Sequence, residues 1–436
     1  MSGSAFKKGC HPEKILMAAC KSRTINTDGS WISHDGGFGN RWGNIVSSYL
    51  LDDRHPIVKL SAVTKILNTK QNWKVSEFSR AYRKEIAILD GKLEDFIVAF
   101  PISGSPNLLG LTESFAAPEF KITYDPVTDA EKEIAKSRAA LLNDRHFKKI
   151  FDTYLKFKKS AEVHIYVKAL HSHHAQAISR DILDEVFGIT VFLSNLTLSR
   201  DHIGLLLPVS QILVAPMTTV HKSDGSLTQE TFWYDNWNGD PADSFLSLTD
   251  NAIVRDDIEK IRARINTSLW REDCQQAFRM FFQFASEPDR KASFLLGWQL
   301  LEFLVSGERQ KGIHTDTDAI LSRACRFYAD YDLKLVQASY FKDARNAISH
   351  GHALPPFDDL GLLFQLKEFI RPILNHFVSN PFKFKNRCEF TDFCDAGNDP
   401  QGIKAKIELQ ERNLHVLGSA LRFVSKTESV NPRLKE

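Results

Sequence analysis

Apolar residues in the first 250 positions of the chain follow two different spacings. Short apolar runs rich in β-branched and aromatic residues, typical of strands, occupy positions 96–100, 120–124, 163–167, 212–214 and 231–234. Apolar residues three and four positions apart, typical of amphipathic helices, occupy positions 75–89, 129–158 and 173–195. Residues 24–44 are rich in Gly, Ser, Asn and Asp, which predicts an ordered loop or hairpin instead of a helix. We therefore predict an α+β region over residues 1–245.

The pattern changes near a cluster of Asn, Gly and Pro at positions 236–241, which is typical of a domain boundary. Beyond this cluster strand patterns nearly vanish, and helical spacing predicts helices around residues 274–281, 294–305, 316–327, 333–348 and 360–378. Pro372 should kink or interrupt the last of them. We predict an all-α helical bundle over residues 255–380, followed by a C-terminal extension over 381–436 with one helix at about 403–424.

The overall composition limits the class of protein. The chain has 436 residues, 43% of them apolar and 25% charged, so we expect two or three globular domains. Its formal net charge of +2 provides no chain-wide field that would attract nucleic acid, and any RNA site must be a local patch. The sequence has neither an apolar stretch long enough to span a bilayer nor an apolar signal-peptide core. These absences predict a cytoplasmic protein with no membrane partner.

Several common kinds of site lack support in the sequence. Six cysteines are scattered along the chain, which predicts reduced thiols instead of a disulfide framework. Cys388 and Cys394 lack the paired spacing of a zinc site, and the histidines at 171–174 are better explained by capping of the helix that follows. The motifs of P-loop nucleotide hydrolases, α/β-hydrolases and zinc proteases do not occur. We therefore predict no metal and no cofactor.

The predicted helix at 333–348 carries the most informative chemistry. Arg345 lies at the edge of its apolar stripe, where a charged group is half removed from water. Asn346 and His350 are four residues apart and therefore close in angle on one face. Gly351 suits the end of the helix, which would place His350 at a helix terminus facing a cleft or an interface. The core-facing stripe itself should contain Val336, Tyr340, Phe341, Ala344, Ala347 and Ile348.

These residue types match the needs of RNA cleavage without a metal. Such cleavage requires a base for the ribose 2′-proton, an acid for the leaving 5′-oxygen and a cation for the phosphorane-like transition state. His350 can supply the acid and base because its unperturbed pKa is about 6.5. Arg345 can supply the permanent cation, since its planar fork bonds two phosphate oxygens at once. Asn346 can orient the phosphate or the imidazole by hydrogen bonding.

The run Arg345-Asn346-Ala347-Ile348-Ser349-His350 resembles the Arg, polar residue, three variable residues, His motif of HEPN ribonucleases. The resemblance extends loosely over 265–380, from an upstream helix with Trp298, Leu301 and Glu302 to one closing helix after the motif. It implies catalytic roles for Arg345, Asn346 and His350. It also implies a homodimer in which two motif helices form one composite site, and a product with a 2′,3′-cyclic phosphate. The family's recurrent roles in antiviral defence, abortive infection and toxin systems suggest a regulated effector that cuts cellular RNA.

Other interpretations of the same residues remain open. The bundle is equally compatible with a non-catalytic dimerising or RNA-binding module, and a helix-terminal histidine can simply interact with the helix dipole. Glu302 either pairs with Arg345 or lies on the polar face of its helix. His352 is better explained as a solvent-facing loop residue than as a second acid or base. The Lys/aromatic alternation at 382–387 suits either RNA or a solvated surface with buried Phe. For residues 1–245 we expect a sensing or regulatory role toward an unknown trigger.

Overall fold

The structure is a computed structural model of the whole chain. It divides into two compact units, unit 1 (Met1–Ser194 and Leu205–Glu259) and unit 2 (Asn195–Gly204 and Lys260–Glu436). The residues that it describes are 5–25, 31–33, 41–52, 54–70, 72–103, 120–123, 128–143, 160–193, 209–210, 214, 217–228, 233–234, 251–306, 316–350, 359–396 and 400–430.

Unit 1 begins with a small helical layer. Its elements are α1 (Pro12–Lys21), β1 (Arg23–Ile25), β2 (Trp31–Ser33), α2 (Arg41–Ser48), α3 (Pro56–Leu67) and α4 (Val75–Asp90). The antiparallel pair β1–β2 confirms the hairpin predicted within 24–44, although α2 already begins at Arg41, so the exclusion of helix was wrong at the end of that range. Helices α1 and α3 each start with a proline, whose fixed φ and missing N–H suit the first turn. Phe6, Leu16, Val63 and Phe78 pack together in the core of this layer.

A five-stranded antiparallel sheet follows in unit 1, with strand order β4-β5-β3-β6-β7. The strands are β3 (Glu94–Ser103), β4 (Phe120–Thr123), β5 (Ser160–Ala169), β6 (Met217–Lys222) and β7 (Trp233–Tyr234). The runs predicted at 96–100, 120–124 and 163–167 therefore lie in β3, β4 and β5, and part of 231–234 forms β7. Ile212 and Leu213 lie outside the described residues.

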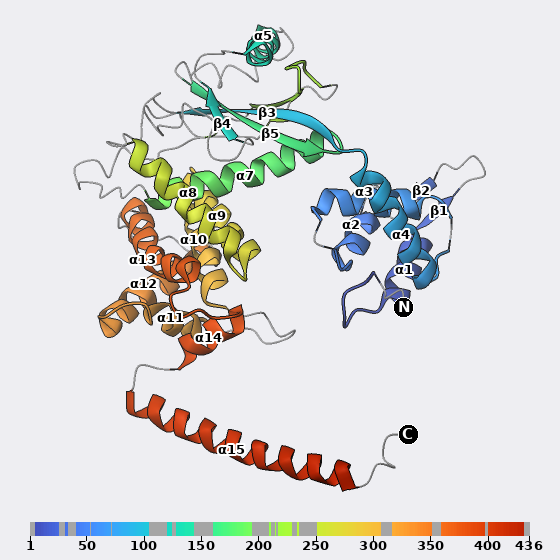
Figure 1. Cartoon of the computed structure of the whole chain (residues 1–436). Helices are drawn as coiled ribbons and strands as arrows, with labels where there is room; N and C mark the ends of the chain where they lie inside the picture. The colour runs from blue at the N-terminus through green and yellow to red at the C-terminus, as the bar shows by residue number, and fades with distance from the viewer. Residues whose placement is uncertain are drawn as a thin grey trace. The chain divides into compact units, whose positions relative to one another are not determined.

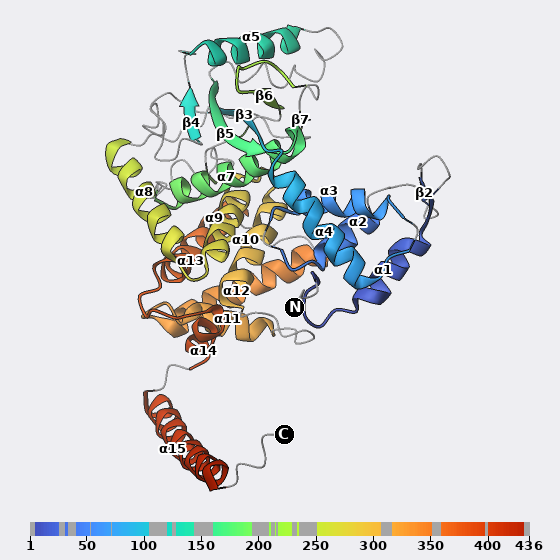
Figure 2. The same cartoon turned by 45° about the vertical axis from the view of Figure 1, so that its right-hand side comes forward.

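Two helices cover the sheet on opposite faces, as Figures 1 and 2 both show: α5 (Asp129–Asn143) and α7 (Ser172–Leu193). Side chains alternate between the faces of a strand, so a strand covered on both sides is apolar throughout. Strand β3 behaves in this way, because Ile97 and Ala99 pack against Ile134 of α5 and their neighbours Val98 and Phe100 are also buried. The predicted helix at 129–158 is described only as far as residue 143.

A buried polar network joins α5 to the sheet. Arg138 of α5 is 2% exposed, and its Nε donates to Glu162 Oε1 over 2.7 Å while Nη1 donates to Thr219 Oγ1 over 2.6 Å. His164 Nε2 lies 3.2 Å from Glu162 Oε2, and His221 Nδ1 lies 2.9 Å from the Gly225 carbonyl. Burial alone would raise the pKa of Glu162, but Arg138 and His164 outweigh it and lower this pKa to about 2. Burial lowers the pKa of His221 to about 4.

Unit 2 is a helical bundle. Its elements, with α8 crossing the division between the units, are α8 (Asn251–Thr267), α9 (Arg271–Ser286), α10 (Arg290–Val305), α11 (Thr317–Cys325), α12 (Tyr331–Ser349), α13 (Asp359–Ser379), α14 (Arg387–Asp395) and α15 (Pro400–Val430). Helix α10 is central and contacts α9, α11, α12, α13 and α14. A Cβ on Gly297 of α10 would lie 2.8 Å from a Leu366 side-chain carbon and 2.9 Å from one of Phe284, so glycine permits this close helix packing. The predicted order of an α+β region followed by a helical region is therefore present.

Several local predictions need correction. Helix α13 continues through Pro372, which therefore does not interrupt it. Val336 and Tyr340 of α12, predicted as core, are 71% and 38% exposed. Helices α8 and α14 were not predicted, and α15 is longer at both ends than the helix predicted at 403–424. None of the described helices combines the length and the apolar composition that crossing a membrane requires.

Candidate functional site

The end of α12 presents the three residues of the predicted site. The helix stops at Ser349, and His350 is its C-terminal cap, with a backbone N–H that donates to the Asn346 carbonyl over 3.0 Å. His350 is exposed, whereas Arg345 and Asn346 are half-buried. The predicted placement of His350 at a helix terminus is therefore correct. Gly351 and His352 lie outside the described residues.

Arg345 and Asn346 are joined directly. Arg345 Nη1 donates to Asn346 Oδ1 over 3.1 Å, although successive residues of a helix point about 100° apart. Asn346 and His350 differ by only about 40° around the helix, but Arg345 and His350 differ by about 140°. The hydrogen bond thus draws the guanidinium of Arg345 toward the face that carries Asn346 and His350. The guanidinium, the amide and the imidazole therefore lie on the same side of the end of α12.

The rest of α12 divides into a buried and an exposed apolar side. On the buried side, Phe341 is fully enclosed, and its ring centroid lies 5.4 Å from that of Phe369 in α13. The exposed side is a stripe that we call the α12 stripe, formed by Leu333, Val336 and Tyr340, which are 66%, 71% and 38% exposed. These residues are three and four positions apart and so lie on one face. Exposed apolar surface of this kind is typical of a protein interface.

Neighbouring helices hold α12 in place. Lys342 Nζ of α12 lies 2.6 Å from Asp318 Oδ1 of α11. Just before α12, the hydroxyl of Tyr328 donates to the Phe369 carbonyl of α13, and the two rings stack with centroids 5.2 Å apart. The start of the motif helix is therefore fixed to α13.

The carboxylate of Glu302 bonds to a residue of its own helix. Its Oε1 accepts a hydrogen bond from Trp298 Nε1 over 2.7 Å, on the same helix α10. The structure thus gives Glu302 a partner in Trp298 and gives Arg345 a partner in Asn346. A role for Glu302 in holding Trp298 within the core follows from this contact.

The sequence interpretation missed one buried cation in unit 2. Lys367 of α13 is 1% exposed, and its ammonium has no hydrogen-bond partner among the residues described. Burial lowers the pKa of Lys367 to about 8. The signal in the sequence was a lysine placed directly after Leu366 in the apolar stripe of α13, where a charge is costly.

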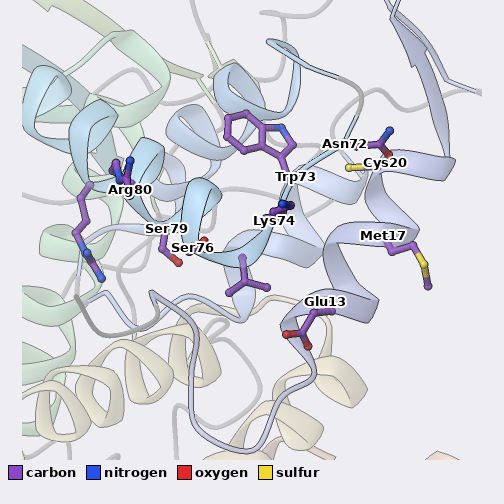
Figure 3. Close-up of a pocket in the computed structure, with 11 residues that line it drawn as sticks. Glu13, Met17, Cys20, Asn72, Trp73, Lys74, Ser76, Ser79 and Arg80 are labelled. Carbon is purple, nitrogen blue, oxygen red and sulfur yellow. The ribbon is translucent and has the colours of Figure 1, made fainter. Parts of the chain in front are cut away.

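Unit 1 contains a pocket of its own, shown in Figure 3. Its volume is about 740 Å³, and it lies between α1 and the first turns of α4. Three cationic side chains and one carboxylate line it beside an apolar wall, which suits a ligand with an anionic group and an apolar part. The lining residues include Glu13, Met17, Trp73, Lys74, Arg80 and Arg83.

The described parts of the chain contain no group of three His, Cys, Asp or Glu side chains that could hold a metal ion. At positions 171–174, His171 Nδ1 accepts a hydrogen bond from the His174 backbone N–H over 3.2 Å, which confirms the capping interpretation. No family model, no curated protein and no solved structure is significantly similar to this chain.

Proposed function

We propose that this chain is a metal-independent endoribonuclease of the HEPN type. The observation that carries the proposal is the hydrogen bond from Arg345 to Asn346 one turn before His350, which is exposed at the end of α12. A permanent cation, an amide and a titratable imidazole are the groups that this reaction requires. The resemblance of residues 345–350 to the HEPN motif supports the same assignment.

Each residue has a defined role in the proposed reaction. The His350 imidazole removes the proton of the ribose 2′-hydroxyl, and the resulting oxygen attacks the adjacent phosphorus. Arg345 stabilises the negative charge that accumulates on the phosphoryl oxygens. Asn346 orients Arg345 through the observed hydrogen bond. Departure of the 5′-oxygen, which takes up a proton from an imidazolium, leaves a 2′,3′-cyclic phosphate and a 5′-hydroxyl.

Among the described residues, one copy of the chain contributes one histidine, His350, to this site, whereas the reaction needs an acid and a base together. A second copy provides the second imidazole if two α12 helices pack through the α12 stripe. The exposure of Leu333, Val336 and Tyr340 supports this homodimer. In such a pair the two His350 side chains act as base and acid on one RNA strand.

The biological role that fits this activity is a regulated toxin or antiviral defence effector in the cytoplasm that cuts cellular RNA. Uncontrolled RNA cleavage is toxic, so a regulatory region is expected in the same chain. The cationic pocket of unit 1 supports a sensing role for that region, with an anionic trigger. The alternative is a non-catalytic dimerising module, because the α12 stripe by itself also explains dimerisation.

The test is cleavage of total cellular RNA in EDTA by wild-type protein, His350→Ala and Arg345→Ala, with His173→Ala on exposed His173 as a matched control. We expect His350→Ala to lower the rate by about 10²–10⁴-fold and Arg345→Ala by about 10²–10³-fold. The control should cut like wild type and leave cyclic phosphate ends. Equal cleavage by all four proteins would refute the assignment. If every variant still dimerises and wild type cleaves no RNA with or without phage-infected cell extract, the result would favour the non-catalytic module.

A further inference from the structure

Helix α15 has an unusual combination of length and exposure. It runs for 31 residues from Pro400 to Val430. Large apolar side chains along it are exposed to solvent, including Ile407 at 52%, Leu414 at 66% and Leu417 at 64%. Most of the stability of a helix in a protein comes from burying an apolar face against another element. A long helix with such a face exposed is therefore incomplete without a partner.

The spacing of these residues identifies the kind of partner. Successive positions along one side of α15 are separated by four, three, four, three and four residues, which is the heptad repeat of a coiled coil. A repeat of 3.5 residues keeps the same face toward a partner helix over several turns. We call this face the α15 seam, and it consists of Ile403, Ile407, Gln410, Leu414, Leu417 and Leu421.

The charges beside the seam favour a second copy of the same helix in parallel orientation. Lys406 directly precedes Ile407 of the seam, and Glu411 directly follows Gln410. In a parallel coiled coil in register, these are the flanking positions that face each other, so Lys406 of each copy meets Glu411 of the other. Gln410 then lies opposite its own copy, where two amides can donate and accept reciprocally. In an antiparallel pair these positions give neither the contact of Lys406 with Glu411 nor the contact between the two Gln410 side chains.

The seam is also large enough for a stable pair. Each of its five apolar side chains can bury on the order of 100 Å². Two copies therefore bury roughly 1,000 Å², which is the size at which a specific protein interface becomes stable.

We propose that α15 forms a parallel two-stranded coiled coil with α15 of a second copy of this chain. The pair is closed by the α15 seam and set in register by Gln410 and by two Lys406–Glu411 contacts. This inference goes beyond the proposed function, since it concerns a different helix and makes no use of RNA cleavage. Its test compares variants of α15 in a chain whose α12 stripe and site residues are unchanged, so a loss of association in these variants reports the α15 contact and not the RNA site.

The first experiment measures the dimer dissociation constant of the full chain by sedimentation equilibrium. Leu414→Glu/Leu417→Glu places two charges in the seam, and the matched control His415→Glu/Ser419→Glu places two charges outside the seam on the same exposed turns. We expect the seam variant to weaken the dimer by at least about 100-fold and the control by less than about threefold. A monomeric wild type, a wild-type mass of three chains, or equal dissociation constants for the two variants would overturn the proposal.

The second experiment tests orientation. Lys406→Glu makes both flanking contacts repulsive in a parallel pair, and we expect it to weaken the dimer by about tenfold. Adding Glu411→Lys restores opposite charges at each contact and should return the dissociation constant to within about threefold of wild type. If the double variant is as weak as Lys406→Glu alone, the helices are not parallel and in register, and the proposal fails.

Discussion

The network that joins α5 to the sheet of unit 1 makes a quantitative prediction about stability. Replacing Arg138 with Met keeps a long apolar stem but removes the cation that contacts Glu162 and Thr219. Removing one partner of a buried ion pair typically costs about 3–5 kcal/mol, because the other charge remains without compensation. Glu162 keeps its contact with His164, and its side chain is 24% exposed, so we expect the lower end, about 3 kcal/mol.

A second substitution separates the loss of the contact from the penalty of the remaining charge. Arg138→Met/Glu162→Gln removes both charges, and we expect it to recover about half of the lost stability. The assay is hydrogen exchange of the amides in β5 and β6, measured by mass spectrometry, because it reports unit 1 separately from the rest of the chain. A loss below about 1 kcal/mol in the single variant, or a double variant no more stable than the single one, would refute the reasoning.

Three further predictions concern residues outside this pair. Phe341→Ala should destabilise unit 2 by about 3–5 kcal/mol in urea unfolding. Ser339→Ala, at an exposed position of α12 outside the α12 stripe, should change it by less than about 0.5 kcal/mol, and similar losses would contradict the observed burial. His221 is held neutral with a pKa of about 4, so its contribution to the stability of unit 1 should fall by about 1.5 kcal/mol from pH 6.5 to pH 5. The loss of stability over this range should be smaller by that amount in His221→Gln, measured in the same exchange assay. Lys367→Met should raise the free energy of unfolding of unit 2 by about 2–3 kcal/mol at pH 7. This gain should disappear as pH rises from about 8 to about 10.5, because the lysine is then neutral in both the folded and the unfolded chain. No gain at pH 7 would mean that the ammonium has a partner.

The sequence predicted most of the long regular elements, although it missed α8, and it predicted the short ones poorly. Strands β3 and β5 and helices α7, α9, α10 and α12 have apolar patterns that extend over many residues, so their period is clear. Helices α1 to α3 are short, and α2 follows a Gly-rich segment whose composition favours loops. Local sequence patterns predict secondary structure poorly where tertiary packing determines whether a short segment is helical.

In the candidate site, too, features with a local sequence signal were predicted and features that depend on side-chain contacts were not. The position of His350 at the end of α12 followed from sequence, because helix ends have local signals. The direct bond between Arg345 and Asn346 did not, since it depends on side-chain conformations. Val336 and Tyr340 were assigned to the core because an exposed apolar stripe and a core-facing stripe have the same period along a helix. The contact of Arg138 with Thr219, 81 residues away, involves no local pattern at all.

The attachment of Tyr328 to α13 has a mechanical consequence for His350. Helix α12 begins three residues after Tyr328, and its 19 residues form a rod about 27 Å long with His350 at the far end. Phe369 of α13 contacts Tyr328 and also Phe341 in the middle of α12, so a tilt of α13 carries α12 with it. A tilt of about 2° would move the His350 end of α12 by roughly 1 Å, and in the proposed reaction a displacement of that size would lower the rate by about 100-fold.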